Sequence, residues 1–227
     1  MNKRLLVICP SRGRPGRLKQ MLDSLYDTKN GDVDCVVYVA NDDPKLEDYK
    51  QFDKVVIGER FNIAKVFNYV SCDLKPGYRY YAEANDDHIY HTKGWDDKLI
   101  GVIESKGNGV GISYGSNGLN ESLPSAVCMS ANIINALGYM VNPLFEHTYI
   151  DNYFKDLGEK IGRLFKVEDV FIEHRHYLSG KASMDDNYAY VLSKEALDKG
   201  KAAYDEWLDK YCVEDVKKVI DECRLYN

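Results

Sequence analysis

The sequence predicts an α/β fold in which a mostly parallel central sheet is flanked by helices. Apolar, strand-like runs alternate with helical patterns through about the first 85 residues, as is typical of such sheets. Three of these runs end in polar, charged loops. The 227 residues, 44% of them apolar, are enough for one domain with a substantial core. We expect this domain to span residues 1–192, with residues 193–227 forming a helical extension packed on it.

The first strand and helix are the clearest elements of the first half. Residues 5–9 form a continuous apolar run bounded by Pro10, which fits a strand buried on both faces. Apolar residues then recur at helical spacing from Leu18 to Leu25, and the helix is expected to end near Tyr26. The other expected elements of this half are strands at 33–40 and 54–57, a helix at 63–70, and a strand ending at Asn85.

The second half has a less regular pattern. Residues 115–124 are rich in Gly, Ser and Asn and predict a mobile loop. Residues 193–225 are helical by pattern. The remaining expected elements are helices at 95–103, 131–137 and 148–157, and strands at 109–113, 126–129 and 167–174.

Charge and cysteine content argue against several classes of protein, although the cations from Arg4 to Lys19 leave a local basic patch open. The formal charge of -6 and the pI of about 5.4 leave no global basic field that would attract nucleic acid. The six cysteines are widely spaced and form no Cys-x-x-Cys pair, which favours free thiols in a reducing compartment over a disulfide framework or a zinc site. No apolar run approaches the roughly 20 residues of a membrane span, and the run after Arg4 is too short for a signal peptide. We therefore expect a cytoplasmic protein.

One stretch of sequence organises the functional interpretation. Residues 80–88, Tyr-Tyr-Ala-Glu-Ala-Asn-Asp-Asp-His, read as a buried strand that ends in two adjacent carboxylates. Adjacent carboxylates repel, so they are tolerated where they face water, cap a helix or bind a cation. The first two strands end in Pro10-Ser11-Arg12 and Asn41-Asp42-Asp43. Because ligands bind beyond the C-terminal ends of parallel strands, we expect these three loops to converge on one site.

Four segments carry a resemblance to a known family: residues 7–15, residues 37–43, residues 62–68, and residues 85–88 followed by 94–96. In this order they resemble nucleotide-sugar-dependent glycosyltransferases of the GT-A fold, of the family 2-like type, over roughly residues 3–180. The resemblance implies that the first three hold the donor nucleotide and that the fourth is the metal-binding Asp-x-Asp loop. In the fourth segment Asn85 stands where the family has Asp, and Asp86 is expected near the ribose or a bound water. The donor-binding candidates are therefore Pro10, Ser11, Arg12 and Arg14, then Asn41, Asp42 and Asp43, then Asn62 and Lys65, and finally Asn85 and Asp86.

The resemblance also implies a divalent cation, Mn²⁺ or Mg²⁺. A nucleoside diphosphate leaves with negative charge that such a cation stabilises, and carboxylate oxygens suit both ions. The family pattern makes Asp87 the direct ligand. A further ligand is expected from His174 or His176, and His174 is favoured because it directly follows an apolar run. A neutral imidazole ligand would favour Mn²⁺.

The implied reaction is transfer of a sugar, expected to come from a UDP-sugar, to a hydroxyl acceptor with inversion. Inversion needs a general base, and the segment 146–152 resembles the region that supplies it. Asp151, at an expected helix start, is the candidate base, and Glu146 is the alternative. The chain also resembles small bacteriophage glycosyltransferases, which implies host cytoplasm and a modified DNA base or a glycan as acceptor.

Two other classes of function stay open at this point. A nucleotidyltransferase of related fold shares the sheet and a metal-binding carboxylate, but it would favour a denser Gly-rich loop than Gly13 and Gly16 provide. A non-catalytic nucleotide- or glycan-binding module would bind UDP with metal without transferring a sugar.

Overall fold

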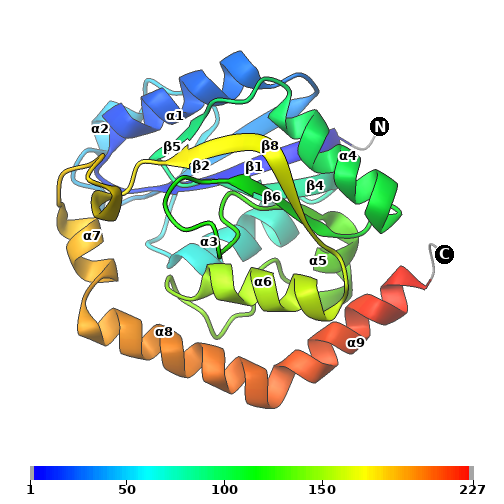
Figure 1. The fold of residues 1–227 in the computed structure, drawn as a ribbon. Helices are drawn as coiled ribbons and strands as arrows, with labels where there is room; N and C mark the ends of the chain where they lie inside the picture. Colours follow the sequence, from blue (N-terminus) through cyan, green and yellow to red (C-terminus); the bar gives the residue numbers. More distant parts are fainter. Residues whose placement is uncertain (1–2, 225–227) are drawn as a thin grey trace.

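An eight-stranded, mostly parallel sheet forms the centre of the molecule in the computed structural model, which describes residues 3–224 (Figure 1). The strands are β1 (Lys3–Ser11), β2 (Val33–Ala40), β3 (Val55–Gly58), β4 (Tyr78–Glu83), β5 (His88–Tyr90), β6 (Ile112–Ser116), β7 (Cys128–Ser130) and β8 (Leu164–His174). Their order is β3-β2-β1-β4-β7-β6-β8-β5, and β7 and β5 run antiparallel to their neighbours.

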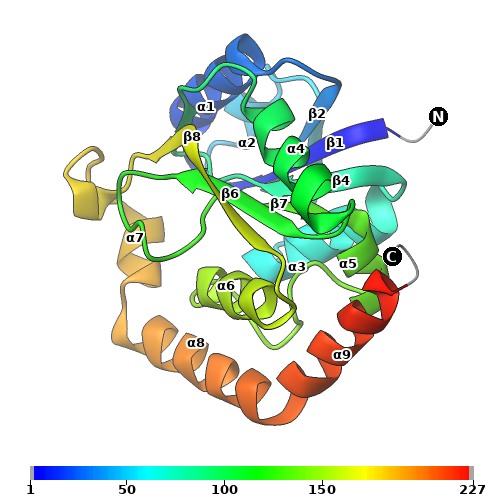
Figure 2. The same ribbon diagram turned by 45° about the vertical axis from the view of Figure 1, so that its right-hand side comes forward.

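Helices cover both faces of this sheet. They are α1 (Pro15–Thr28), α2 (Leu46–Tyr49), α3 (Ile63–Asn68), α4 (Trp95–Gly107), α5 (Ala131–Leu137), α6 (Ile150–Lys160), α7 (Asp186–Val191), α8 (Lys194–Glu206) and α9 (Cys212–Cys223). Helices α1 and α4 lie on one face, α3, α5 and α6 on the other, and α8 and α9 form an outer layer beyond α6 (Figure 1 and Figure 2). The predicted α/β fold class is therefore confirmed.

Strand β1 separates two hydrophobic cores. Leu5 and Val7 pack in the core that contains α1 and α4, whereas Leu6 and Ile8 pack in the core that contains α3, α5 and α6. All four side chains are fully buried. Successive side chains of a strand point to opposite faces, so a strand covered on both faces must be apolar at every position. This is why the uninterrupted apolar run predicts a central strand.

The C-terminal helices share one of these cores. Trp207 is fully buried and packs in the same core as Phe145 and Val219. The buried Asp215 accepts hydrogen bonds from Trp207 Nε1 at 2.9 Å and from Tyr139 OH at 2.6 Å. Buried polar groups that are paired in this way fix one arrangement of the surrounding helices. The boundary between residues 192 and 193 stays a prediction.

Most predicted elements differ from the structure only at their ends. Residues 33–40 and 131–137 match β2 and α5 in full. The strand predicted at 109–113 is β6 at 112–116, and the helix predicted at 148–157 is α6, which starts at Ile150. The residues predicted to be helical from 193 form α8 and α9, joined by a wider helical turn at Trp207–Tyr211. The predicted end of this stretch, Leu225, lies outside the described residues. Between residues 3 and 224, no helix combines the length and apolar character that crossing a bilayer requires.

Candidate active site

The turn between β4 and β5 carries the two adjacent aspartates. The backbone N–H of His88 donates to the Asn85 carbonyl at 3.1 Å, and His88 Nδ1 accepts from the Asn85 backbone N–H at 3.2 Å. These bonds close the turn, and Asp86 and Asp87 are each 4% exposed. Strand β5, which no sequence pattern predicted, pairs antiparallel with β8 and sets His88 opposite His174.

The two oxygens of the Asp87 carboxylate have different surroundings. Oδ2 accepts a hydrogen bond from Tyr188 OH at 2.5 Å. Oδ1 lies 3.2 Å from His174 Nε2, which is an ion pair when the imidazole is protonated, and this buried oxygen has no hydrogen-bond partner among the described residues. Native proteins rarely leave a buried acceptor unpaired, so such an atom points to a ligand. Asp87, His88 and His174 also bring ligand atoms within 4.8 Å of one another, which fits a divalent cation.

The histidines of this cluster have different roles. The fully buried His88 uses Nδ1 to accept from the Asn85 backbone, and burial lowers its pKa to about 3, so the ring is neutral. His176 Nδ1 accepts from the Leu178 backbone N–H at 3.1 Å, which caps a short helical turn. His174 is therefore the imidazole that faces Oδ1 of Asp87.

Asp87 and His174 stabilise each other's charged forms. Burial opposes ionisation of Asp87, but His174 beside it holds the pKa of Asp87 well below its usual value. Burial likewise favours neutral His174, but Asp87 raises the pKa of His174. Burial raises the pKa of Asp86 to about 6, with Arg14 opposing the rise and Asp87 adding to it.

The loop after β1 meets the acidic turn. Ser11 Oγ donates to Asp86 Oδ2 at 2.7 Å, and Arg14 Nη1 donates to Asp86 Oδ1 at 3.2 Å. Tyr49 OH lies 2.8 Å from Ser11 Oγ and accepts from the Arg14 backbone N–H at 2.8 Å. Strands β1 and β4 are parallel neighbours, so their C-terminal ends lie together. The structure thus brings Ser11, Arg14, Asp86, Asp87 and His174 into one cluster.

The loop after β2 lies beside this cluster. Asp43 accepts from the backbone N–H groups of Gly13 at 2.9 Å and Lys45 at 2.7 Å, so both of its oxygens hold backbone in place. Asp42 is exposed and pairs with Arg12 Nη1 at 2.7 Å. Asn41 is also exposed, and Pro10 lies half-buried within β1.

Two predicted donor-binding residues lie at the start of α3. Asn62 Oδ1 accepts from the Lys65 backbone N–H at 2.8 Å and so caps the helix. The Lys65 ammonium lies 3.9 Å from the centre of the Phe61 ring, a cation–π contact. Both side chains are exposed, and their contact with a nucleotide stays a prediction.

The candidate base and its alternative have different environments. Asp151 lies in the first turn of α6 and is half-buried. Burial raises its pKa to about 6, and His174 opposes the rise. The residue before the helix, Tyr149, has a φ of 66°, a strained value of the kind that clusters at functional sites. Glu146 is paired with Lys199 at 2.7 Å, and its side chain is 37% exposed.

Glu83, near Asp151, gives a prediction about stability. Burial raises the pKa of Glu83 well above its usual value, and Asp151 adds to the rise. The native protein therefore keeps a proton that the unfolded chain releases above about pH 4.3. The free energy of unfolding then falls as pH rises from there to the native pKa, by up to about 1.4 kcal/mol per pH unit from this group.

Glu83→Gln should remove this decrease in the free energy of unfolding with rising pH. In urea titrations, the variant is expected to be more stable than wild type at pH 7, and the difference should disappear below about pH 4. Glu168→Gln is the control, because the Glu168 side chain is 78% exposed. Parallel pH profiles for Glu83→Gln and wild type would refute the prediction.

The loop predicted to be mobile lies next to His174. The carbonyl of Asn117 accepts from the His174 backbone N–H at 2.9 Å. Within the loop, Glu121 Oε1 accepts from Ser116 Oγ at 2.6 Å and from the Gly118 backbone N–H at 2.9 Å. These bonds give the loop a defined shape beside the cluster, and its mobility stays a prediction.

Sequence reasoning missed Asp185 and Tyr188. Asp185 accepts from Arg14 Nε at 2.8 Å and from Nη2 at 2.7 Å, a bidentate ion pair. The Arg14 guanidinium lies 4.0 Å from the centre of the Tyr188 ring, and Tyr188 OH reaches Asp87. Asp185 is a recognisable helix cap, but no local pattern places it beside Arg14.

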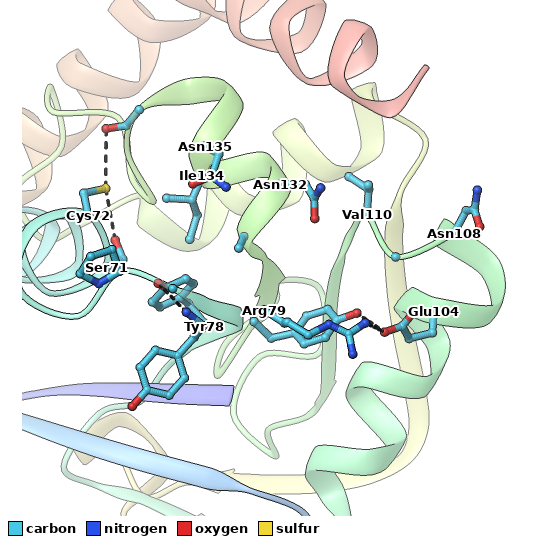
Figure 3. Close-up of a pocket in the computed structure, with 17 residues that line it drawn as sticks. Ser71, Cys72, Tyr78, Arg79, Glu104, Asn108, Val110, Asn132, Ile134 and Asn135 are labelled. Atoms are coloured by element: carbon cyan, nitrogen blue, oxygen red, sulfur yellow. Dashed lines mark hydrogen bonds and ion pairs between the residues drawn. The ribbon is translucent and has the colours of Figure 1, made fainter. Parts of the chain in front are cut away.

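A separate cavity lies at the opposite end of β4 (Figure 3). Its volume is about 700 Å³, and Tyr78, Asn132 and Asn135 are among its lining residues. Two further lining residues, Arg79 and Glu104, pair with each other at 2.5 Å. The cavity contains none of the predicted site residues, so we place the candidate active site at the strand ends instead.

No protein-family model and no curated protein sequence matches this chain. Solved structures do match. The mannosyltransferase PcManGT from Pyrobaculum calidifontis, in complex with GDP-Man and Mn²⁺, is 10% identical, with a TM-score of 0.61 over 98% of this chain and 74% of its own. TarS from S. aureus, in complex with UDP-GlcNAc, is 12% identical, with a TM-score of 0.57 over 98% of this chain and 80% of its own.

A third match is glucosyl-3-phosphoglycerate synthase from Mycobacterium tuberculosis, in complex with Mn²⁺, UDP-Glc and phosphoglyceric acid. It is 12% identical, with a TM-score of 0.60 over 88% of this chain and 79% of its own. At such low identity the likeness concerns the fold. The chain therefore has the predicted GT-A type of fold, the fold of nucleotide-sugar glycosyltransferases.

Proposed function

We propose that this chain is a metal-dependent glycosyltransferase that moves a sugar from a UDP-sugar to a hydroxyl group with inversion. The observation that carries the proposal is Asp87 Oδ1, which is buried, has no hydrogen-bond partner among the described residues and lies 3.2 Å from His174 Nε2. It lies where open α/β sheets bind ligands, beyond the C-terminal ends of the strands. Neighbours of the same fold that were solved with nucleotide sugars, Mn²⁺ or Mg²⁺ support the donor and the cation.

In this proposal Asp87 and His174 hold Mn²⁺ or Mg²⁺. When bound, the cation supplies positive charge for the diphosphate that leaves. Arg14 provides a second positive charge, and its guanidinium is already oriented by Asp86 and Asp185. Because this guanidinium is already in place, little free energy is spent on reorienting it during the reaction.

Asp151 is the proposed base. Its carboxylate takes the proton from the acceptor hydroxyl as that oxygen forms the new bond to the sugar. A pKa of about 6 leaves Asp151 ionised at neutral pH yet basic enough to accept a proton. The electrostatic interaction between Asp151 and His174 supports a position close to the cation.

The other predicted residues are proposed to surround the nucleotide. Asp43 would act indirectly, by holding the loop after β1 in place, because both of its carboxylate oxygens already accept hydrogen bonds from backbone N–H groups. The residues proposed to lie along the nucleotide are Pro10, Ser11, Arg12, Asn41, Asp42, Asn62, Lys65, Asn85 and Asp86.

The proposed acceptor is a glycan or a modified DNA base, as in the small bacteriophage enzymes that the chain resembles. The proposed location is the cytoplasm, of the host if the chain is phage-encoded. All six cysteines are free in the structure and five are buried, which supports a reducing compartment.

The test combines binding and product analysis. UDP is expected to raise the melting temperature only when Mn²⁺ or Mg²⁺ is present, since ligands of the native state stabilise it by mass action. Incubation with UDP-sugars and acceptor glycans should release free UDP. Release of pyrophosphate would identify a nucleotidyltransferase instead, and UDP binding without turnover of any donor would identify a binding module.

A further inference from the structure

Tyr188 makes a buried contact with Asp87 across 101 positions of sequence. Its hydroxyl donates to Asp87 Oδ2 at 2.5 Å and accepts from Arg17 Nη1 at 3.0 Å. Arginine can only donate, so the hydroxyl proton of Tyr188 is left for an acceptor. Asp87 Oδ2 at 2.5 Å is a much closer acceptor than the Arg175 carbonyl at 3.4 Å. The ring is 3% exposed and lies under the Arg14 guanidinium, which holds the hydroxyl in place.

This contact fixes the rotation of the Asp87 carboxylate. With Oδ2 held by Tyr188, Oδ1 faces His174 Nε2 at 3.2 Å and has no hydrogen-bond partner among the described residues. Neighbouring ligand atoms on an octahedral ion with bonds of about 2.1 Å are roughly 3 Å apart. The orientation that Tyr188 imposes is therefore one in which Asp87 and His174 can share a cation.

The helix that carries Tyr188 is anchored independently of Asp87. Asp185, the cap of α7, forms the bidentate pair with Arg14, and Asn187 Nδ2 donates to the Arg12 carbonyl at 2.7 Å. Both anchors lie in the loop after β1. The position of the Tyr188 hydroxyl therefore depends on how firmly α7 is held against this loop.

Resting on the proposed function, we propose that Tyr188 is a positioning residue for the cation: it holds Oδ2 of Asp87 so that Oδ1 faces His174. Residues that orient metal ligands in this way commonly contribute 10- to 100-fold to affinity. Because coupling between two sites is reciprocal, cation binding must also strengthen the docking of α7.

The test uses Mn²⁺ alone, without nucleotide. Tyr188→Phe keeps the ring and removes the hydroxyl, and is expected to weaken Mn²⁺ binding by about 10- to 100-fold, measured by electron paramagnetic resonance. The matched control is Tyr190→Phe, since Tyr190 is 59% exposed. Near-ultraviolet circular dichroism of the metal-free proteins checks that each variant keeps its tertiary packing.

A second pair of variants tests the anchoring of α7. Asp185→Asn should weaken Mn²⁺ binding without touching Asp87, whereas Asp186→Asn, at an exposed neighbour, should not. In wild type, Mn²⁺ should slow hydrogen exchange of residues 186–191, and Tyr188→Phe should reduce that slowing. Unchanged or tighter Mn²⁺ binding by Tyr188→Phe, with wild type binding normally, would overturn the positioning role alone. Failure of wild type to bind Mn²⁺, either alone or with UDP, would refute the proposed function as well.

Discussion

Asp151→Asn is expected to lower kcat by about 10²- to 10⁴-fold while changing the dissociation constant of the donor by no more than a few-fold. Asn is close to Asp in shape but cannot accept the proton of the acceptor hydroxyl. The dissociation constant of the donor should change little, because the proposed donor contacts lie at Asp87, Arg14 and the loops after β1 and β2. Steady-state kinetics with one UDP-sugar, together with calorimetric binding of UDP, separate the two effects.

The same residue sets an expected pH dependence. Burial raises the pKa of Asp151 to about 6, and the base works only when ionised. The rate should therefore be constant above about pH 7 and fall nearly tenfold per pH unit well below pH 6. The residual activity of Asp151→Asn should not show this fall of the rate below pH 6.

Glu146→Gln is the comparison for Asp151→Asn. Glu146 is paired with Lys199 at the surface, so its variant should keep most of the turnover. If instead Asp151→Asn turned over at a rate near wild type, Asp151 would have no part in the reaction. The base would then be Glu146, or the transfer would retain configuration and need no such residue.

Asp87→Asn should abolish the cation-dependent part of UDP binding. The variant keeps a side chain of similar size beside Tyr188 but removes the charge that we propose binds the cation. In wild type, UDP at 100 times its dissociation constant adds about 2.7 kcal/mol to the free energy of unfolding. In Asp87→Asn, UDP with Mn²⁺ should raise the free energy of unfolding by no more than UDP alone does.

Chelation provides the matched control for this experiment. Wild type in EDTA should behave as Asp87→Asn does in Mn²⁺, because both lack the bound cation. Equal affinity for UDP in wild type and variant, with and without EDTA, would remove Asp87 from metal binding. The metal-free melting temperature of the variant shows whether the fold is intact.

Long apolar runs made much of the fold predictable. Residues 5–9 are apolar throughout, and a strand covered on both faces buries all of them, so the central place of β1 follows from composition. The strand predicted at 126–129 is found as β7, but β5 could not be predicted in this way. Strand β5 has three residues and begins at His88, inside the polar cluster. The pairing of such short strands depends on their neighbours more than on their own residues.

The candidate site was predictable where it follows from strand ends. Ser11 ends β1, and Asp86 follows the end of β4. These two strands are parallel neighbours in the sheet, so their C-terminal ends lie together. Tyr188 has no such signal, because α7 is short and its contact with Asp87 spans 101 positions. Only the packed structure shows that the two side chains meet.

The distances along the chain between Asp87, His174 and Tyr188 have a consequence for biosynthesis. During translation the acidic turn emerges well before β8 and α7 have been made. Contacts between distant segments form late in folding, because a long loop must close before they are gained. An incomplete chain that ends before β8 presents the two adjacent carboxylates without their histidine and tyrosine partners. The cation site should therefore be among the last parts of the molecule to mature, after the sheet around β1 has formed.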